Sequence, residues 1–132
     1  MKIDSHLENL RESFEEVEMA IKKGLVLKQR TIGFHTSAAA VDMLEIILHQ
    51  KNLIDPGLVL KHDWFDSMKT VSAKFPFDFP HKHLILSLMM KIEVPRNNLC
   101  YGKRQNEEVL EEIIRNFNHL KQLFQEVTGY EL

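Results

Sequence analysis

The sequence lacks the features that mark secreted and membrane-spanning proteins. Cys100 is its single cysteine, so an internal disulfide is excluded, which fits a reducing compartment. The amino-terminal stretch MKIDSHLENL carries acids and has no apolar core of a signal peptide. No apolar run approaches the roughly 20 residues that a membrane-spanning helix needs. The sequence therefore predicts a cytoplasmic protein that does not enter a membrane.

The sequence also lacks a large net charge of either sign and the common cofactor-binding motifs. Seventeen basic residues face nineteen acidic ones, a net charge of −2, so the chain has no overall cationic field and any nucleic-acid site must be local. There is no glycine-rich phosphate loop, no Gly-x-Ser-x-Gly motif and no cysteine–histidine zinc spacing. His81 and His83 flank one lysine, but alternate residues of a helix diverge by about 200°. We therefore expect no cofactor and no metal ion.

What the chain does have is helical periodicity. Apolar residues recur at alternating spacings of four and three along the first segment, which predicts an amphipathic helix. These residues are Ile3, Leu7, Leu10, Phe14, Val17 and Ile21. Gly24 suits the end of this helix. A second helix is expected from about residue 25 to residue 51, and its apolar residues cover most of its circumference, which is typical of a central, buried helix.

The remaining segments predict three more helices. Asp55 before Pro56 has the pattern of an N-cap, so we expect a third helix to begin there and to end at the two prolines of residues 75–80. A shorter helix follows over about residues 84–92, and a final helix is expected between an N-cap at Asn106 and Gly129. Five helices with short connections predict an all-α, single-domain five-helix bundle over residues 1–132.

The most informative stretch, just before the last helix, is Arg96 followed directly by Asn97, with the ring of Tyr101 at the fifth position after the arginine. Three features precede this stretch in the chain. They are an amphipathic first helix, a second helix that is rich in small residues and ends in an apolar run (residues 38–48), and a Lys-His-Asp string (residues 61–63). The order of these pieces resembles the HEPN domain family, helical bundles of prokaryotic toxins, their partners and some eukaryotic proteins.

The resemblance implies a place for RNA. In catalytic HEPN members an arginine, a polar residue and a histidine after four to six residues form a metal-independent RNA-cleaving site, usually facing its copy across a dimer. Arginine holds the phosphate, and histidine transfers the proton near neutral pH. Here Arg96 and Asn97 match, but Tyr101 replaces the histidine and, with a pKa of about 10, is a poor base. Because tyrosine can still stack on a base, the resemblance implies an RNA or nucleotide site that includes Arg96, Asn97, Tyr101, Lys103 and Arg104.

Helix geometry separates the two key residues of this stretch. Residues five apart on a regular helix lie about 140° from each other, so Arg96 and Tyr101 converge only if the turn is irregular. Otherwise we expect the arginine to cap the preceding helix and the tyrosine to pack under a loop. A literal Arg-x4-His string also occurs, early in the second helix, at Arg30 and His35. These two residues are the fallback site.

Acidic residues in the second helix also require an explanation. Asp42 and Glu45 lie in an otherwise apolar helix, where an unpaired buried charge is expensive, so we expect them to pair with a cation, reach a rim or line a pocket. The candidate partners are Arg30, Arg96 and His35. A further pair, His62 and Asp63, is interpreted as having a capping or surface role because adjacent helical side chains do not face each other.

Three functions remain open from the sequence. The favoured one is a HEPN-like binding or regulatory module that contacts RNA or a nucleotide without catalysis, as a homodimer. The family resemblance adds a nucleotidyltransferase as a partner protein and a toxin–antitoxin setting. The alternative is a metal-independent ribonuclease toxin in which Tyr101 or a distant histidine replaces the missing one. The third is a structural bundle for protein interactions.

Overall fold

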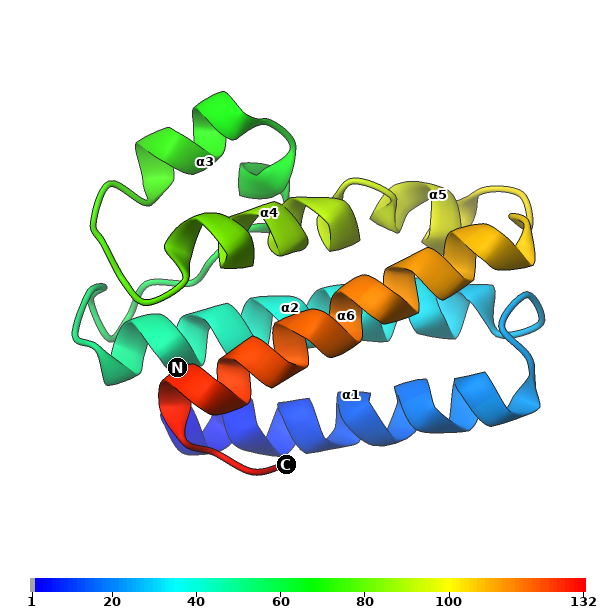
Figure 1. The fold of residues 1–132 in the computed structure, drawn as a ribbon, viewed down its shortest axis with the longest axis horizontal. Helices are drawn as coiled ribbons and strands as arrows, with labels where there is room; N and C mark the ends of the chain where they lie inside the picture. Colours follow the sequence, from blue (N-terminus) through cyan, green and yellow to red (C-terminus); the bar gives the residue numbers. More distant parts are fainter. Residues whose placement is uncertain (1) are drawn as a thin grey trace.

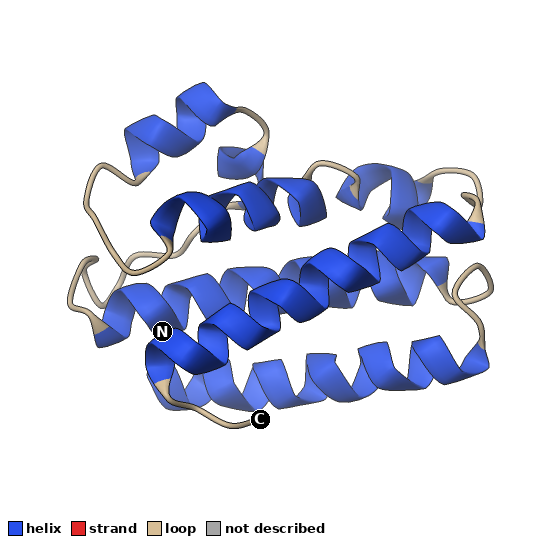
Figure 2. Ribbon diagram, in the orientation of Figure 1, coloured by secondary structure: helices blue, strands red, loops and turns tan. Residues whose placement is uncertain are grey.

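The computed structural model describes residues 2–132, and every regular element in that range is a helix (Figures 1 and 2). In chain order they are α1 (Ile3–Lys23), α2 (Gln29–Gln50), the 3₁₀ helix η1 (His62–Phe65), α3 (Met68–Lys74), α4 (Lys82–Glu93), α5 (Arg96–Tyr101) and α6 (Glu107–Thr128). The predicted all-α bundle is therefore confirmed. The five expected helices correspond to α1, α2, α3, α4 and α6, and α5 is an additional short helix.

The centre of the bundle is α2. It packs against α1, α4, α5 and α6, and Figure 1 shows α6 crossing in front of it, with α1 on one side and α4 on the other. Ala39, Ala40, Leu44 and Ile47 are all 0% exposed, so both the small and the large residues of this helix are in the core. By length and composition α2 is apolar enough to cross a membrane, with a mean hydropathy of 1.3, but 72% of that window is buried inside the fold. This is the environment of a core helix.

The two long outer helices, α1 and α6, end as the sequence predicts. Gly24 after α1 has φ 124° and Gly129 after α6 has φ 81°, and each backbone N–H donates to a carbonyl of the preceding turn. Glycine adopts this positive φ without the cost that a side chain would add. Asn106 occupies the N-cap position of α6, although its side chain makes no capping hydrogen bond. Phe14 of α1 and Phe117 of α6 meet edge to face at 5.8 Å, which joins the two helices across the core.

The predicted start of the third helix is wrong. The carbonyl of Asp55 accepts a hydrogen bond from the N–H of Leu58 at 3.0 Å, which closes a single turn, and the chain then continues without regular structure to η1. The physical reason is a tether to α2: Leu60 is 4% exposed, and its N–H donates to Oε1 of Glu45 at 2.7 Å. The helix α3 begins only after Ser67, whose hydroxyl caps its first turn.

The elements η1 and α3 form a small lobe on the bundle. In Figure 1 this lobe lies beyond α4, and α3 packs mainly against η1, which in turn packs against α4. A chain of ring contacts holds the lobe and the segment after it together. The rings belong to Trp64, Phe65, Phe75, Phe77 and Phe79.

The short helix α5 lies directly on the beginning of α2 because a glycine and a buried amide accommodate it. A Cβ added to Gly33 would lie 2.6 Å from Cβ of Leu99, closer than real side chains approach. Gln29 is 0% exposed; its Nε2 donates to the carbonyls of Leu99 at 3.2 Å and Lys103 at 2.9 Å, and its Oε1 accepts from the N–H of Gln105 at 2.6 Å. These contacts fix α5, and the segment that follows it, against α2.

Candidate functional site

The two ends of α5 face different hollows. Arg96 lines a hollow of about 180 Å³ together with residues of η1 and the end of α4, whereas Tyr101 lines one of about 270 Å³ between α2 and α5. Five positions along a helix separate two side chains by about 140°, as the sequence argument anticipated. Arg96 and Tyr101 therefore do not converge on one site within the chain.

The hollow between α2 and α5, which we call the tyrosine hollow, brings the fallback pair and Tyr101 together. Its lining residues are Arg30, Thr31, Phe34, His35, Cys100 and Tyr101. Tyr101 is 75% exposed and Phe34 is 51% exposed, so two aromatic rings stand in solvent at its edge. Both residues of the Arg-x4-His string on α2 thus border the same space as the tyrosine that stands in place of the motif histidine.

Neighbouring contacts hold the tyrosine hollow in shape. Nδ1 of His35 and Oγ of Ser13, a buried residue of α1, are 3.1 Å apart and hydrogen-bonded, which leaves Nε2 of the imidazole for a ligand. The ring of Phe34 meets that of His35 edge to face at 5.0 Å. Burial raises the pKa of the Cys100 thiol, although Arg96 and Arg30 act in the opposite direction. Cys100 therefore lines the hollow as a protonated thiol and does not act as a nucleophile.

The chemistry of the tyrosine hollow suits part of a nucleic acid better than a buried cofactor. Its volume is slightly below the range of about 300–1,000 Å³ that is usual for small-molecule pockets. A guanidinium and an imidazole are present beside the two rings, and none of its described lining residues is acidic. An anion with an aromatic base attached would meet complementary groups at this place.

The other sequence-predicted residues lie outside the tyrosine hollow. Asn97 is exposed and lines the same hollow as Arg96. Lys103 and Arg104 are exposed and follow α5, in the segment that Gln29 holds, and neither lines either of the two hollows. They add positive charge near the carboxyl end of α5.

The hollow that contains Arg96, which we call the arginine hollow, has a histidine–carboxylate pair that the sequence did not indicate. Nδ1 of His62 is 2.8 Å from Oε2 of the buried Glu93, and the hydroxyl of Ser37 donates to the other carboxylate oxygen at 2.8 Å. The side chain of His62 is 41% exposed, so it lies at the surface as expected, but it also pairs with a buried carboxylate of α4 that the sequence did not indicate. Nε of Arg96 is buried and has no hydrogen-bond partner among the described residues. Asp63 and Asp66 also line this hollow.

The cation that pairs with the buried acids of α2 is a histidine of α1. Nδ1 of His6 lies 2.7 Å from Oδ1 of Asp42, and Nε2 of His6 lies 2.7 Å from Oε2 of Glu45. The prediction of Arg30, Arg96 or His35 as the partner is wrong. Arg30 is the second residue of α2, about 22 Å along the helix from Glu45. The helix α1 runs antiparallel to α2, so its first turn, which contains His6, lies beside the carboxyl end of α2, where Glu45 stands (Figure 1).

This arrangement changes the protonation of His6. Burial alone would lower the pKa of its imidazole, but the two carboxylates outweigh that effect and raise the pKa to about 9. His6 was not recognised in the sequence, although a signal exists. It stands three residues after Ile3 and four before Leu10, on the stripe that predicts the buried face of α1.

Comparison with protein-family models, with curated protein sequences and with solved structures finds no match for this chain.

Proposed function

We propose that this protein is a HEPN-like binding module that contacts RNA or a nucleotide through the tyrosine hollow and does not cleave it. The observation that carries the proposal is the convergence of two exposed rings, Phe34 and Tyr101, with the guanidinium of Arg30 in a hollow whose described lining includes no acid. The arginine hollow, in contrast, is lined by Asp63, Asp66 and Glu93. These acids oppose a polyanion.

Each group of the tyrosine hollow has a part in this proposal. An exposed ring that stacks on a base contributes about 1–3 kcal/mol in proteins that bind single strands, without preference for sequence. The guanidinium of Arg30 binds a phosphate by paired hydrogen bonds. His35 offers its Nε2 to a ribose hydroxyl or a phosphate oxygen, because Nδ1 is engaged by Ser13. Lys103 and Arg104 extend the positive charge beyond α5.

The resemblance to HEPN proteins adds a homodimer and a nucleotidyltransferase partner in a toxin–antitoxin pair to the proposal. The all-helical fold supports the resemblance at the level of architecture. Light scattering after size exclusion measures the dimer directly, because two chains of 15.5 kDa double the mass. The proposed phosphate contact moves from Arg96, where the family pattern puts it, to Arg30.

The test of the binding proposal is the affinity for a fluorescent single-stranded RNA oligonucleotide. Tyr101→Ala and Phe34→Ala should each weaken binding by roughly 5- to 150-fold, the equivalent of losing one stacked base. Arg30→Gln should weaken binding and also reduce the slope of log affinity against log salt by about 0.7, because one phosphate contact is lost.

Arg11→Gln is the matched control, since Arg11 is exposed on α1 and is not among the residues lining the tyrosine hollow. It should leave both the affinity and the salt slope unchanged. Titrations with adenosine monophosphate separate a nucleotide site from an RNA site. If neither RNA nor nucleotide binds the wild type, or if Tyr101→Ala binds as well as the control, the proposal fails and the structural bundle takes its place.

A second candidate function, the metal-independent ribonuclease, is favoured by the arginine hollow. His62 is held by the buried Glu93 through Nδ1, so Nε2 is the ring atom left to exchange a proton. The unpaired Nε of Arg96 is at the same hollow. A distant histidine thus stands near the motif arginine. Asp63 and Asp66 line the hollow too, which is why we rank this function second.

Incubation with structured RNA in the presence of a chelator tests the second function. We expect no cleavage above the level of Arg96→Ala, because two carboxylates repel the substrate at the arginine hollow. Cleavage that disappears in His62→Ala and persists in His119→Ala would reverse the ranking of the two functions. His119 is the control because it is an exposed histidine of α6 and does not line the arginine hollow.

A further inference from the structure

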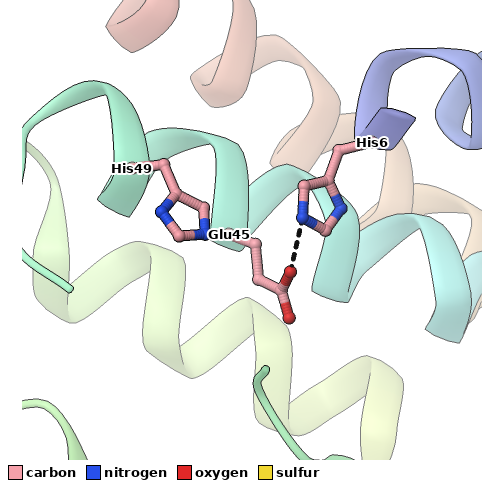
Figure 3. Close-up of side chains that lie close together, drawn as sticks. All are labelled: His6, Glu45 and His49. Carbon is pink, nitrogen blue, oxygen red and sulfur yellow. Dashed lines mark ion pairs between the residues drawn. The ribbon is translucent and has the colours of Figure 1, made fainter. Parts of the chain in front are cut away.

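Three potential metal ligands meet where the first turn of α1 packs on the end of α2. They are His6, Glu45 and His49, and one ligand atom from each lies within 4.8 Å of the other two. Figure 3 shows these side chains gathered at one place, with His6 paired to Glu45. His6 and Glu45 are each 2% exposed, whereas His49 is partly buried and lies at the edge. This cluster belongs to neither of the two hollows.

Two nitrogens of this cluster lack the hydrogen bonds that burial demands. Nε2 of His6 and Nε2 of His49 are both buried, and neither has a hydrogen-bond partner within residues 2–132. The approach of His6 Nε2 to Glu45 Oε2, at 2.7 Å, is close enough for an ion pair but is not aligned as a hydrogen bond. A buried polar group without a partner destabilises the folded state. Nε2 of His6 thus has only its ion pair with Glu45, and Nε2 of His49 has no partner among the described residues.

Neighbouring groups orient the ligand atoms of His6 and Glu45 by hydrogen bonds, as they do in metal-binding proteins. Asp42 is paired with Nδ1 of His6 at 2.7 Å, which directs Nε2 of the same ring towards Glu45 and His49. The N–H of Leu60 donates to Oε1 of Glu45 at 2.7 Å, which leaves Oε2 for a ligand. Histidines that bind metals almost always have a carboxylate or carbonyl on their second nitrogen. His6 has that arrangement.

The charges of the cluster call for a dication. Asp42 and Glu45 bring two negative charges, and no lysine or arginine among the described residues forms a salt bridge with either. A divalent ion would balance the two carboxylates.

We propose that His6 Nε2, Glu45 Oε2 and His49 Nε2 bind a divalent transition-metal ion of the zinc type, with Asp42 as the positioning residue. Two imidazoles and one carboxylate form a set that zinc accepts, with water in the fourth tetrahedral position. Metal–ligand distances of about 2 Å place tetrahedral ligand atoms about 3.3 Å apart. His6 Nε2 and Glu45 Oε2, now 2.7 Å apart, would separate slightly, and His49, whose ligand atom lies within 4.8 Å of both, would move in. Binding releases the proton of His6. The ion joins the start of α1 to the end of α2.

The test uses tag-free protein that has been stripped with a chelator and then titrated with zinc chloride near neutral pH. We expect one zinc ion per chain and a higher midpoint of thermal unfolding with zinc than without it. Asp42→Asn should weaken zinc binding by about 10- to 100-fold, because the carboxylate that orients His6, and its negative charge, are lost while all three ligands remain. His49→Gln should weaken it at least as much, because a ligand is lost.

The controls make the outcome decisive. His119→Gln alters an exposed histidine away from the cluster and should leave the zinc affinity unchanged. Circular dichroism of His49→Gln checks that its helices persist, and Co²⁺ in place of zinc gives a visible absorption band that should be lost in this variant. The proposal is overturned if the folded wild type takes up no zinc, or if His49→Gln and His119→Gln bind it equally. The cluster would then be a proton-bridged ion pair.

Discussion

Gln29 shows how a single side chain prepares the proposed binding surface. It is fully buried in the first turn of α2, yet it holds Leu99, Lys103 and Gln105 through three hydrogen bonds to their backbones. These bonds satisfy the carboxyl end of α5 and position Tyr101 next to Arg30. The sequence gives little warning of this role, since a glutamine at the start of an apolar helix looks like a solvated residue.

Replacement of this amide should be costly. Gln29→Met keeps the length of the side chain and removes all three hydrogen bonds, so the free energy of unfolding should fall by about 1–3 kcal/mol. Urea denaturation measures the change. Gln122→Met, at an exposed position of α6, is the control and should differ little from the wild type. Equal midpoints for the two variants would show that the contacts of Gln29 contribute nothing to stability.

His6, also a single residue, shows why the pairing of buried charges is hard to predict. The need of Asp42 and Glu45 for a partner follows from the sequence, because they interrupt an apolar helix. Which cation meets them depends on how α1 and α2 pack, and helix periodicity does not specify this. The arginines that looked suitable lie at the other end of α2 or on α5.

Among the elements, α5 owes its position to the glycine beneath it. Gly33 lets the backbone of α5 approach α2 so closely that an added Cβ would lie 2.6 Å from Leu99 and 3.3 Å from Cys100 Sγ. With α5 in this position, Tyr101 lines the same hollow as Arg30 and His35. The sequence placed the Arg96–Tyr101 stretch before the last helix, but it could not indicate that the stretch is itself a helix lying on α2.

The substitution Gly33→Ala has two opposing effects on the free energy of unfolding, and they differ in size. Alanine in place of glycine inside a helix gains about 1 kcal/mol from propensity, whereas overpacking against a neighbouring helix costs about 1–3 kcal/mol. Because the contact is with a Cβ fixed to the backbone of α5, we expect a net loss of stability and weaker RNA binding together. Thermal unfolding and the RNA titration measure both. Gly57→Ala is the control, since nothing lies within 4 Å of its added Cβ.

Helix ends illustrate what sequence patterns predict well. Gly24 and Gly129 end their helices as expected, because a positive φ is a local property that glycine adopts readily; Gly129 has the left-handed conformation, and Gly24 has φ 124° with ψ 125°. The start of the third helix is wrong because Asp55 and Pro56 form a local turn signal that fits more than one structure. The hydrogen bond between Leu60 and Glu45 selects the single turn over the helix. Because this bond joins residues that are 15 positions apart, the local pattern does not predict it.

For the molecule as a whole, stability is distributed unevenly between the bundle and the lobe. α2 is surrounded by four helices, while α3 packs mainly against η1 (Figure 1). Most large, fully buried side chains belong to the bundle; Phe65 in the lobe and Phe75 directly after it have this degree of burial. The proposed RNA surface and the proposed metal cluster both lie on the bundle.

Hydrogen exchange should therefore separate the two parts. Amides in the middle of α2 should exchange only through global unfolding, and those of α3 should exchange through local opening with a lower free energy, because few contacts hold the lobe. Mass spectrometry of peptides over Ala39–Leu48 and Met68–Lys74 measures the difference. Equal protection in the two peptides would contradict the prediction and would mean that the lobe and the bundle unfold together.

The central position of α2 has a consequence for insertions and deletions. Arg30 and His35 stand near its beginning, Ser37 near its middle, and Glu45 with His49 near its end. One added residue between Ser37 and Glu45 would turn the later part by about 100° relative to the earlier part and shift it by about 1.5 Å. Either the tyrosine hollow or the histidine cluster would then lose its partners from α1 and α5. The length of α2 is therefore constrained by the two proposed sites at once, and the turn at residues 55–58 is constrained as well, because Leu60 beyond it holds Glu45.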